Sequence, residues 1–159
     1  MKHLIVCIVA ALLIVRADAQ TKITRISVLG KWNAVIVEVP NTFYYDLDKD
    51  SVSLGDALKS KIPPAQLEFM LNGIKQQSAG FKKIHFSFSA DGTFELADEA
   101  DMMIGAQKGP YTVNETNSTI TISGSKAQKQ ALQAEMREGL LKLEMEESGQ
   151  KIYMTFRKA

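Results

Sequence analysis

Apolar and polar residues alternate one by one along several segments in the second half of the chain. In one of these segments Ile84, Phe86 and Phe88 are separated by polar residues. Successive side chains of a β-strand point to opposite faces of a sheet, so this alternation predicts a half-buried strand. The same period predicts further strands over residues 94–96, 111–113, 119–122, 141–146 and 152–157.

Turn-forming sequences join these segments in pairs. Asp91-Gly92 follows the first of them, and an Asp-Gly pair favours the positive φ of a tight turn. Asn114 to Ser118 and Ser148-Gly149 take the same position between the later pairs. Each pair is therefore expected to form a hairpin. An earlier run from Ala34 to Val39 is rich in β-branched residues and predicts the first strand.

A spacing of three to four residues replaces the alternation between residues 54 and 79. This spacing marks one face of an α-helix, so two short amphipathic helices are expected. Pro63 or Pro64 fits the first turn of the second helix, where a missing amide donor leaves no hydrogen bond unmade, and Gly80 fits its end. The apolar residues at this spacing are Leu54, Ala57, Leu58, Leu67, Met70, Leu71 and Ile74.

Two stretches outside these patterns complete the prediction. Residues 46–53 are acidic and turn-like. Residues 126–138 are polar, with apolar residues interspersed, and predict a further helical segment.

The order of the elements predicts the fold class. About seven or eight strands follow one another in hairpin order, and helices are inserted after the first strand. We expect a mostly β protein with an α insertion, in which an antiparallel up-and-down meander closes into a barrel. A two-sheet sandwich is the alternative. No repeat or linker separates Gln20 from Ala159, so residues 20–159 are expected to form one domain.

The first residues have the pattern of a secretory signal peptide. A charged start precedes an apolar run from Leu4 to Val15, and Ala17-Asp18-Ala19 provides a small-residue cleavage site, so residues 1–19 are expected to be removed. The run is shorter than the roughly 20 residues that span a bilayer. Lipid attachment at Cys7 is disfavoured because the apolar run continues beyond it. The sequence thus predicts export to the periplasm, the outer-membrane surface or the extracellular space.

Charge and cysteine content narrow the range of partners. The full chain has a formal net charge of +1, and loss of the signal peptide leaves the rest formally neutral. Nucleic acid is therefore not an expected partner. The remaining chain has no cysteine, so we expect packing, without disulfides, to stabilise it.

Few residues suggest catalysis or a cofactor. His85 is the single histidine after the signal peptide and is expected on the solvent side of its strand. Asp46, Asp48 and Asp50 have the alternating spacing of a calcium loop, but Ser51 and Ala57 stand where that loop requires glycine and glutamate. No cofactor, metal or catalytic residue is predicted. A hydrolase based on carboxylates alone is the least favoured function.

Gly30-Lys31-Trp32 opens the first predicted strand, and Asp91-Gly92 lies in the first hairpin after the helices. This start resembles the Gly-x-Trp opening of lipocalins, and the layout resembles that of exported bacterial lipocalin-like (calycin-type) domains with a helical insertion. In lipocalins the tryptophan plugs the closed end of the barrel and an arginine of the last strand lies across it. The resemblance implies these roles for Trp32 and Arg157, with Gly30 before them.

The resemblance also implies a function. A lipocalin-like barrel would bind a small apolar or amphipathic ligand without catalysis, in the space between its inward side chains. The alternative is a cell-envelope module with a packed interior, which contacts another protein through its outer face or its helices. The helices at 54–79 could cap, fill or flank the barrel. The predicted ligand-binding residues are Phe86, Phe88, Phe94, Met145 and Met154.

Overall fold

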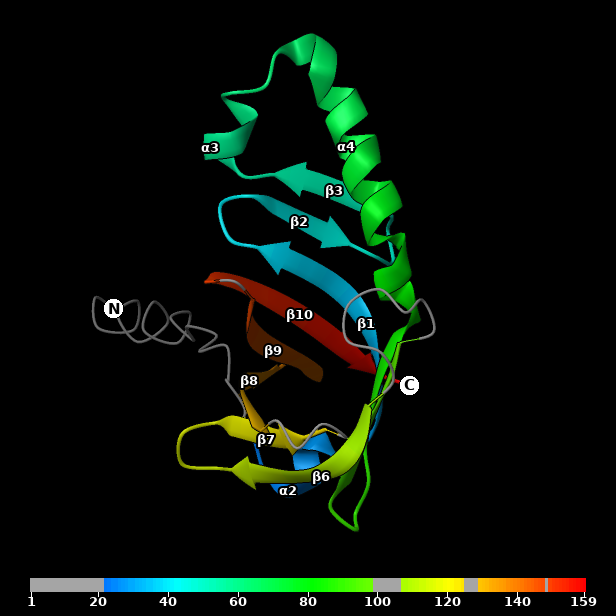
Figure 1. The fold of residues 1–159 in the computed structure, drawn as a ribbon, viewed down its shortest axis with the longest axis vertical. Helices are drawn as coiled ribbons and strands as arrows, with labels where there is room; N and C mark the ends of the chain where they lie inside the picture. Colours follow the sequence, from blue (N-terminus) through cyan, green and yellow to red (C-terminus); the bar gives the residue numbers. More distant parts are fainter. Residues whose placement is uncertain (1–21, 99–106, 125–128, 148) are drawn as a thin grey trace, which may run out of the picture.

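The computed structural model describes residues 22–98, 107–124, 129–147 and 149–159. Over these residues, ten strands form one antiparallel sheet in the order β10-β9-β8-β7-β6-β5-β4-β1-β2-β3. Because β10 also pairs with β1, eight of these described strands, β1 and β4 to β10, close into a barrel (Figure 1). The predicted fold class is confirmed. The predicted signal peptide lies outside the described residues.

The elements follow the chain in simple order. The helical elements are α2 (Arg25–Val28), α3 (Asp56–Lys59), α4 (Pro64–Ser78) and the 3₁₀-helix η1 (Ala79–Lys83). The strands are β1 (Gly30–Val39), β2 (Phe43–Asp46), β3 (Ser51–Leu54), β4 (Ile84–Phe88), β5 (Thr93–Asp98), β6 (Gln107–Asn114), β7 (Thr119–Ser123), β8 (Lys129–Arg137), β9 (Leu140–Glu147) and β10 (Gln150–Lys158).

Strand β1 belongs to two parts of the molecule. Its first residues, 30–33, pair with β4 in the barrel, whereas residues 36–39 pair with β2. Strand β10 pairs with β1 on its other side, and the register shifts between Ala34 and Ile36. Such an irregularity bends a strand and increases its twist. As a result β1 leaves the barrel wall and carries the β2–β3 hairpin beyond it (Figure 1).

The insertion after β1 contains a hairpin as well as helices. The two predicted helices are present, and Pro64 lies in the first turn of α4. The acidic turn predicted over 46–53 is shorter than expected, because Ser51 and its neighbours pair with β2 as strand β3. In Figure 1, α3 and α4 lie beyond β3 at one end of the molecule. The helices therefore flank the barrel and do not fill it.

The helix predicted over 126–138 is wrong, because residues 129–137 form strand β8. This stretch is rich in residues that favour helices, but Leu132, Ala134 and Met136 alternate with polar residues and are all buried. Strand β8 pairs with β7 and β9 on its two sides. Pairing and burial of its inner face outweigh the weak helical preference of the sequence.

Helix α2 closes one end of the barrel beside Trp32. The indole is buried, and its Nε1 donates a hydrogen bond to the Val28 carbonyl over 2.7 Å. The cation over the indole is Lys158, with Nζ 5.6 Å from the ring centroid, because Lys158 is the direct partner of Trp32 across β1 and β10. Arg157 points to the other face of β10 and pairs with Asp48 at 2.6 Å.

Candidate functional site

The three predicted phenylalanines pack together inside the closed half of the barrel. Phe86, Phe88 and Phe94 are each at most 2% exposed. The Phe86 and Phe88 rings stack with their centroids 5.7 Å apart, and Phe156 meets Phe86 edge-on at 5.3 Å. Pairs of this kind stabilise a core beyond the area they bury. These rings form an aromatic floor next to Trp32.

The two predicted methionines lie farther along the strands from Trp32, at different depths. Met154 is 2% exposed, and Met145 is half-buried against the core. Met154 belongs to a row of inward side chains that register places across five neighbouring strands. The row consists of Leu143, Met154, Val37, Tyr45 and Val52.

The apolar lining of the barrel continues onto the β2–β3 hairpin. Met145 pairs with Ile152 across β9 and β10. Phe43 on β2 pairs with both Val39 and Leu54. In the deeper row only Val52 is half-buried, whereas here all of these side chains except Val39 are half-buried. Apolar surface is thus incompletely covered where the barrel wall becomes the hairpin.

An apolar hollow of about 720 Å³ lies along α4. Its described lining comes from a single face of this helix, which we call the α4 groove. Met70 and Ile74 lie at the border between this face and the one predicted to pack, and Gln66 and Gln77 add amide groups. The described lining consists of Ala65, Gln66, Phe69, Met70, Gly73, Ile74 and Gln77.

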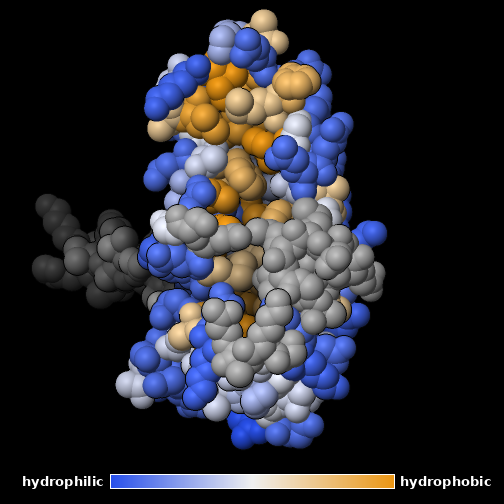
Figure 2. All heavy atoms as spheres, viewed as in Figure 1, coloured by the Kyte–Doolittle hydropathy of each residue, from blue (hydrophilic) through white to orange (hydrophobic). Residues whose placement is uncertain are grey.

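Phe69 is the most exposed large apolar side chain of the described residues, at 83%. A phenylalanine that remains in water loses the free energy that its burial would provide, about 1.5–3 kcal/mol. Figure 2 shows that apolar surface gathers between α3 and α4 over the hairpin and continues down this face, with hydrophilic residues on both sides. A contiguous apolar surface with a polar rim is typical of a binding site.

The carboxylate of Asp50 fixes α4 against the hairpin. It accepts hydrogen bonds from the Tyr45 hydroxyl at 2.6 Å and from Lys82 Nζ at 3.2 Å, and Lys75 Nζ lies 3.3 Å away. The Tyr45 hydrogen bond, followed by those from Lys82 and Lys75, lowers the pKa of Asp50 to about 2. Burial, followed by the bond to Asp50, raises the pKa of Tyr45 to about 12. Asp50 therefore remains charged, and it joins β2, α4 and η1.

The calcium-like aspartates have separate partners. Asp46 pairs with Lys49 at 3.0 Å, Asp48 pairs with Arg157, and Asp50 binds the groups on α4 and η1. Within the described ranges, no group of three or more histidine, cysteine or acidic side chains is placed to hold a metal ion. The aspartates serve the packing of the insertion.

His85 lies on the outer face of β4. Its side chain is half-buried, and it is the direct cross-strand partner of Asn33 on β1. His85 Nδ1 and Asn33 Oδ1 are buried, and neither has a hydrogen-bond partner in the described part of the chain. The predicted solvent-side orientation agrees with this position.

Phe69 is the large apolar residue of the α4 groove that the sequence pattern did not single out. The predicted apolar stripe of this helix consists of Leu67, Met70, Leu71 and Ile74, which are half-buried in the structure. Phe69 lies beside that stripe. The sequence did contain a signal for this residue. An amphipathic helix buries only its apolar stripe, so a large aromatic residue outside that stripe is not needed for the core and indicates a binding surface.

Comparisons with known proteins assign this chain to no family. No protein-family model matches this chain. No curated protein matches it. A similar solved structure is that of a DUF4847 family protein from Bacteroides vulgatus ATCC 8482, with 18% identity and a TM-score of 0.48 over 83% of this chain and 94% of that chain. Among the described residues, no helix has the length and apolar character needed to cross a membrane.

Proposed function

We propose that this protein is a non-enzymatic binding protein and that the α4 groove holds a small apolar or amphipathic ligand. The observation that carries this proposal is the apolar hollow of about 720 Å³ beside an 83% exposed Phe69. Small-molecule sites in proteins have volumes of roughly 300–1,000 Å³, and apolar side chains with a few polar groups line them. The α4 groove matches both criteria.

The side chains of the groove suit a flexible, mostly apolar molecule. Phe69 offers a flat ring, and the Met70 thioether adapts to irregular shapes. A Cβ added at Gly73 would have nothing within 4 Å, so this position leaves the groove open. Gln66 and Gln77 could each donate and accept hydrogen bonds to a polar group of the ligand. An amphipathic ligand would satisfy both kinds of surface.

The proposal keeps the predicted ligand class and adds a site outside the barrel. Phe86 and Phe88 already contact other aromatic rings of the core, and Phe94 is fully buried in the same cluster. A ligand between them would have to separate these rings. The α4 groove requires no such rearrangement. The predicted export would place this groove in the periplasm, at the outer-membrane surface or outside the cell, where the protein would carry or retain its ligand.

A protein partner is the second candidate occupant of the α4 groove. The close packing of the aromatic floor favours this alternative, because a barrel with a filled interior can still present a helix to a partner. Exposed aromatic residues are frequent anchors of protein interfaces. In this case the protein would act as an interaction module of the cell envelope.

Binding of N-phenyl-1-naphthylamine tests the proposal, since this dye becomes fluorescent in apolar sites. We expect saturable binding to the wild type and a loss of affinity of about tenfold or more in Phe69→Ser. Ile26→Ser is the matched control, because Ile26 is 79% exposed on α2, at the other end of the barrel. Absence of saturable binding, or equal losses in both variants, would contradict the proposal.

Native mass spectrometry of protein gently extracted from its own host distinguishes the two occupants. A bound small molecule that Phe69→Ser loses would support the ligand carrier. A protein partner that the same variant loses would support the interaction module instead.

A further inference from the structure

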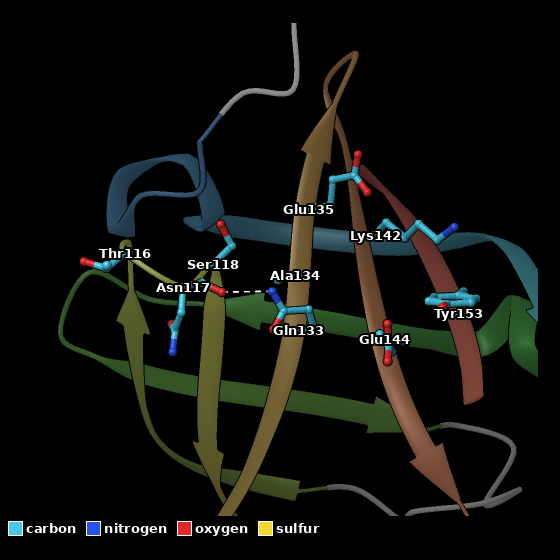
Figure 3. Close-up of a pocket in the computed structure, with 9 residues that line it drawn as sticks. All are labelled: Thr116, Asn117, Ser118, Gln133, Ala134, Glu135, Lys142, Glu144 and Tyr153. Carbon is cyan, nitrogen blue, oxygen red and sulfur yellow. Dashed lines mark hydrogen bonds between the residues drawn. The ribbon is translucent and has the colours of Figure 1, made fainter. Parts of the chain in front are cut away.

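The outer surface of the barrel has a second groove, which is lined mainly by polar and charged residues. Two hollows of about 430 and 240 Å³ lie over the outward faces of β8, β9, β10, β1 and β2. Glu135 and Lys142 line both hollows, so the two are adjoining parts of one depression, which we call the outer groove. Figure 3 shows the larger part, with the β6–β7 turn on one side and Tyr153 on the other.

Strand register arranges the outer groove as a continuous row of side chains. Gln133 on β8 is the direct partner of Glu144 on β9, which is the partner of Tyr153 on β10. Across the closure of the barrel, Glu38 on β1 pairs with Tyr153 on one side and with Tyr44 on the other. Direct cross-strand partners point to the same face, so these five side chains all point outward.

The two tyrosines lie two strands apart in this row. Neighbouring strands are about 4.8 Å apart, so the backbones that carry the two tyrosines are separated by roughly 9.5 Å. Tyr44 is 39% exposed, and Tyr153 lines the larger hollow. Amide and carboxylate groups lie between and beside the rings. The row therefore alternates flat apolar faces with groups that accept or donate hydrogen bonds.

We propose that the outer groove binds a neutral oligosaccharide laid across the strands. A sugar ring has an apolar face of C–H groups, which packs on an aromatic ring, and a periphery of hydroxyl groups. Carboxylates accept hydrogen bonds from hydroxyl groups, and an amide such as that of Gln133 both donates and accepts. A chain of linked sugars repeats this combination, as does the row from Gln133 to Tyr44.

The charge of the outer groove excludes anionic ligands. Four carboxylates line its two parts, against two cationic side chains. Lys142 and Glu38 compensate each other at 3.2 Å, and Glu144 is paired with Lys151 at 2.6 Å, which leaves Glu135 and Glu138 beside Arg137. Phosphate or sulfate groups would meet a surplus of negative charge. The lining residues that carry charge are Glu38, Glu135, Glu138, Glu144, Arg137 and Lys142.

Contacts among the lining residues hold several of them in place before a ligand arrives. Lys142 Nζ lies 4.2 Å from the centroid of the Tyr153 ring, and Glu144 accepts from Lys151 at 2.6 Å. Gln133 donates to the carbonyl of Asn117 over 2.9 Å (Figure 3). Exposed ion pairs of this kind contribute little to stability. Side chains that are already ordered lose less entropy on binding, which favours affinity.

Affinity electrophoresis tests this inference with the whole protein. It is run in native gels that each contain one neutral polysaccharide: hydroxyethylcellulose, galactomannan, arabinoxylan or soluble starch. We expect at least one of them to retard the wild type. Tyr153→Phe should keep this retardation because the ring remains. Tyr153→Ala should weaken binding about tenfold or more, and Tyr44→Ala should weaken it in the same direction.

Other outcomes would overturn the inference. These are retardation by none of the neutral polymers, retardation by dextran sulfate alone, or equal retardation of wild type and Tyr153→Ala. Phe69→Ser separates the two sites, since it should leave retardation unchanged while it weakens dye binding in the α4 groove. Tyr44→Ala remains informative if Tyr153→Ala does not fold, because Tyr44 lies on a different strand and is exposed.

Discussion

At the scale of single residues, Asp50 links the β2–β3 hairpin of the insertion to its helical elements α4 and η1. It lies in the turn between β2 and β3, with a φ of 50°, and its carboxylate binds Tyr45, Lys75 and Lys82. The turn was predicted from its acidic residues, but the partners were not, because they come from α4 and η1, more than twenty residues away in sequence. Sequence spacing carries no information about such contacts.

The pKa of Asp50 predicts a pH dependence of stability. Its pKa falls from 3.8 to about 2 on folding, so the unfolded chain takes up the proton first. The stabilisation is therefore complete above about pH 4 and is lost as the pH falls towards about 2. The melting temperature of Asp50→Asn should change less than that of the wild type between these values. Asp56→Asn, on the exposed face of α3, should follow the wild type.

Trp32 is the residue through which α2 closes the barrel. Trp32→Phe keeps a ring but removes the donor to the buried Val28 carbonyl. We expect a decrease of about 1–3 kcal/mol in the free energy of unfolding, measured by urea titration with circular dichroism. Tyr153→Phe, on the outer face, should change it by less than about 0.5 kcal/mol. Equal free energies of unfolding of both variants would show that the hydrogen bond from the indole to Val28 does not stabilise the fold.

At the scale of elements, alternation predicted the strands that have one clearly apolar face. Strands β4, β5, β9 and β10 are present where Phe86, Phe94, Leu143 and Met154 alternate with polar residues. The pattern failed for β8, because its residues favour helices and its apolar alternation is weak. Pairing with β7 and β9 nevertheless makes it a strand. It also missed β3, which is short and, among the described strands, pairs with β2 alone.

Alanine substitutions at two glycines should change stability in opposite directions and so test how the elements pack. A Cβ at Gly109 on β6 would collide with the carbonyl of Ser123 at the end of β7. Gly109→Ala should therefore lower the free energy of unfolding by about 1–3 kcal/mol. Gly73 lies inside α4 with open space around it, so Gly73→Ala should raise it by about 0.5–1 kcal/mol. Urea titration measures both, and the same sign for both would contradict this packing.

At the scale of the whole molecule, the barrel closes where β10 meets β1. Hairpin order and strand number in the sequence predicted a meander that closes into a barrel, and the resemblance to lipocalin-like proteins implied the same closure. The α4 groove could not be predicted in the same way, because it depends on how β1 leaves the barrel and where α4 then lies. The assignment of ligand contacts to Phe86, Phe88, Phe94, Met145 and Met154 stays a prediction.

Methyl NMR of the methionines, assigned by single Met→Leu substitutions, tests most directly where an apolar ligand binds. Met70 lines the α4 groove, whereas Met136 and Met154 are buried in the barrel wall. On addition of N-phenyl-1-naphthylamine we expect the Met70 methyl signal to shift, because an aromatic ring changes the field at nearby methyl groups, and the signals of Met136 and Met154 to stay unchanged. Shifts of Met136 and Met154 with an unmoved Met70 would place the ligand inside the barrel and contradict this account.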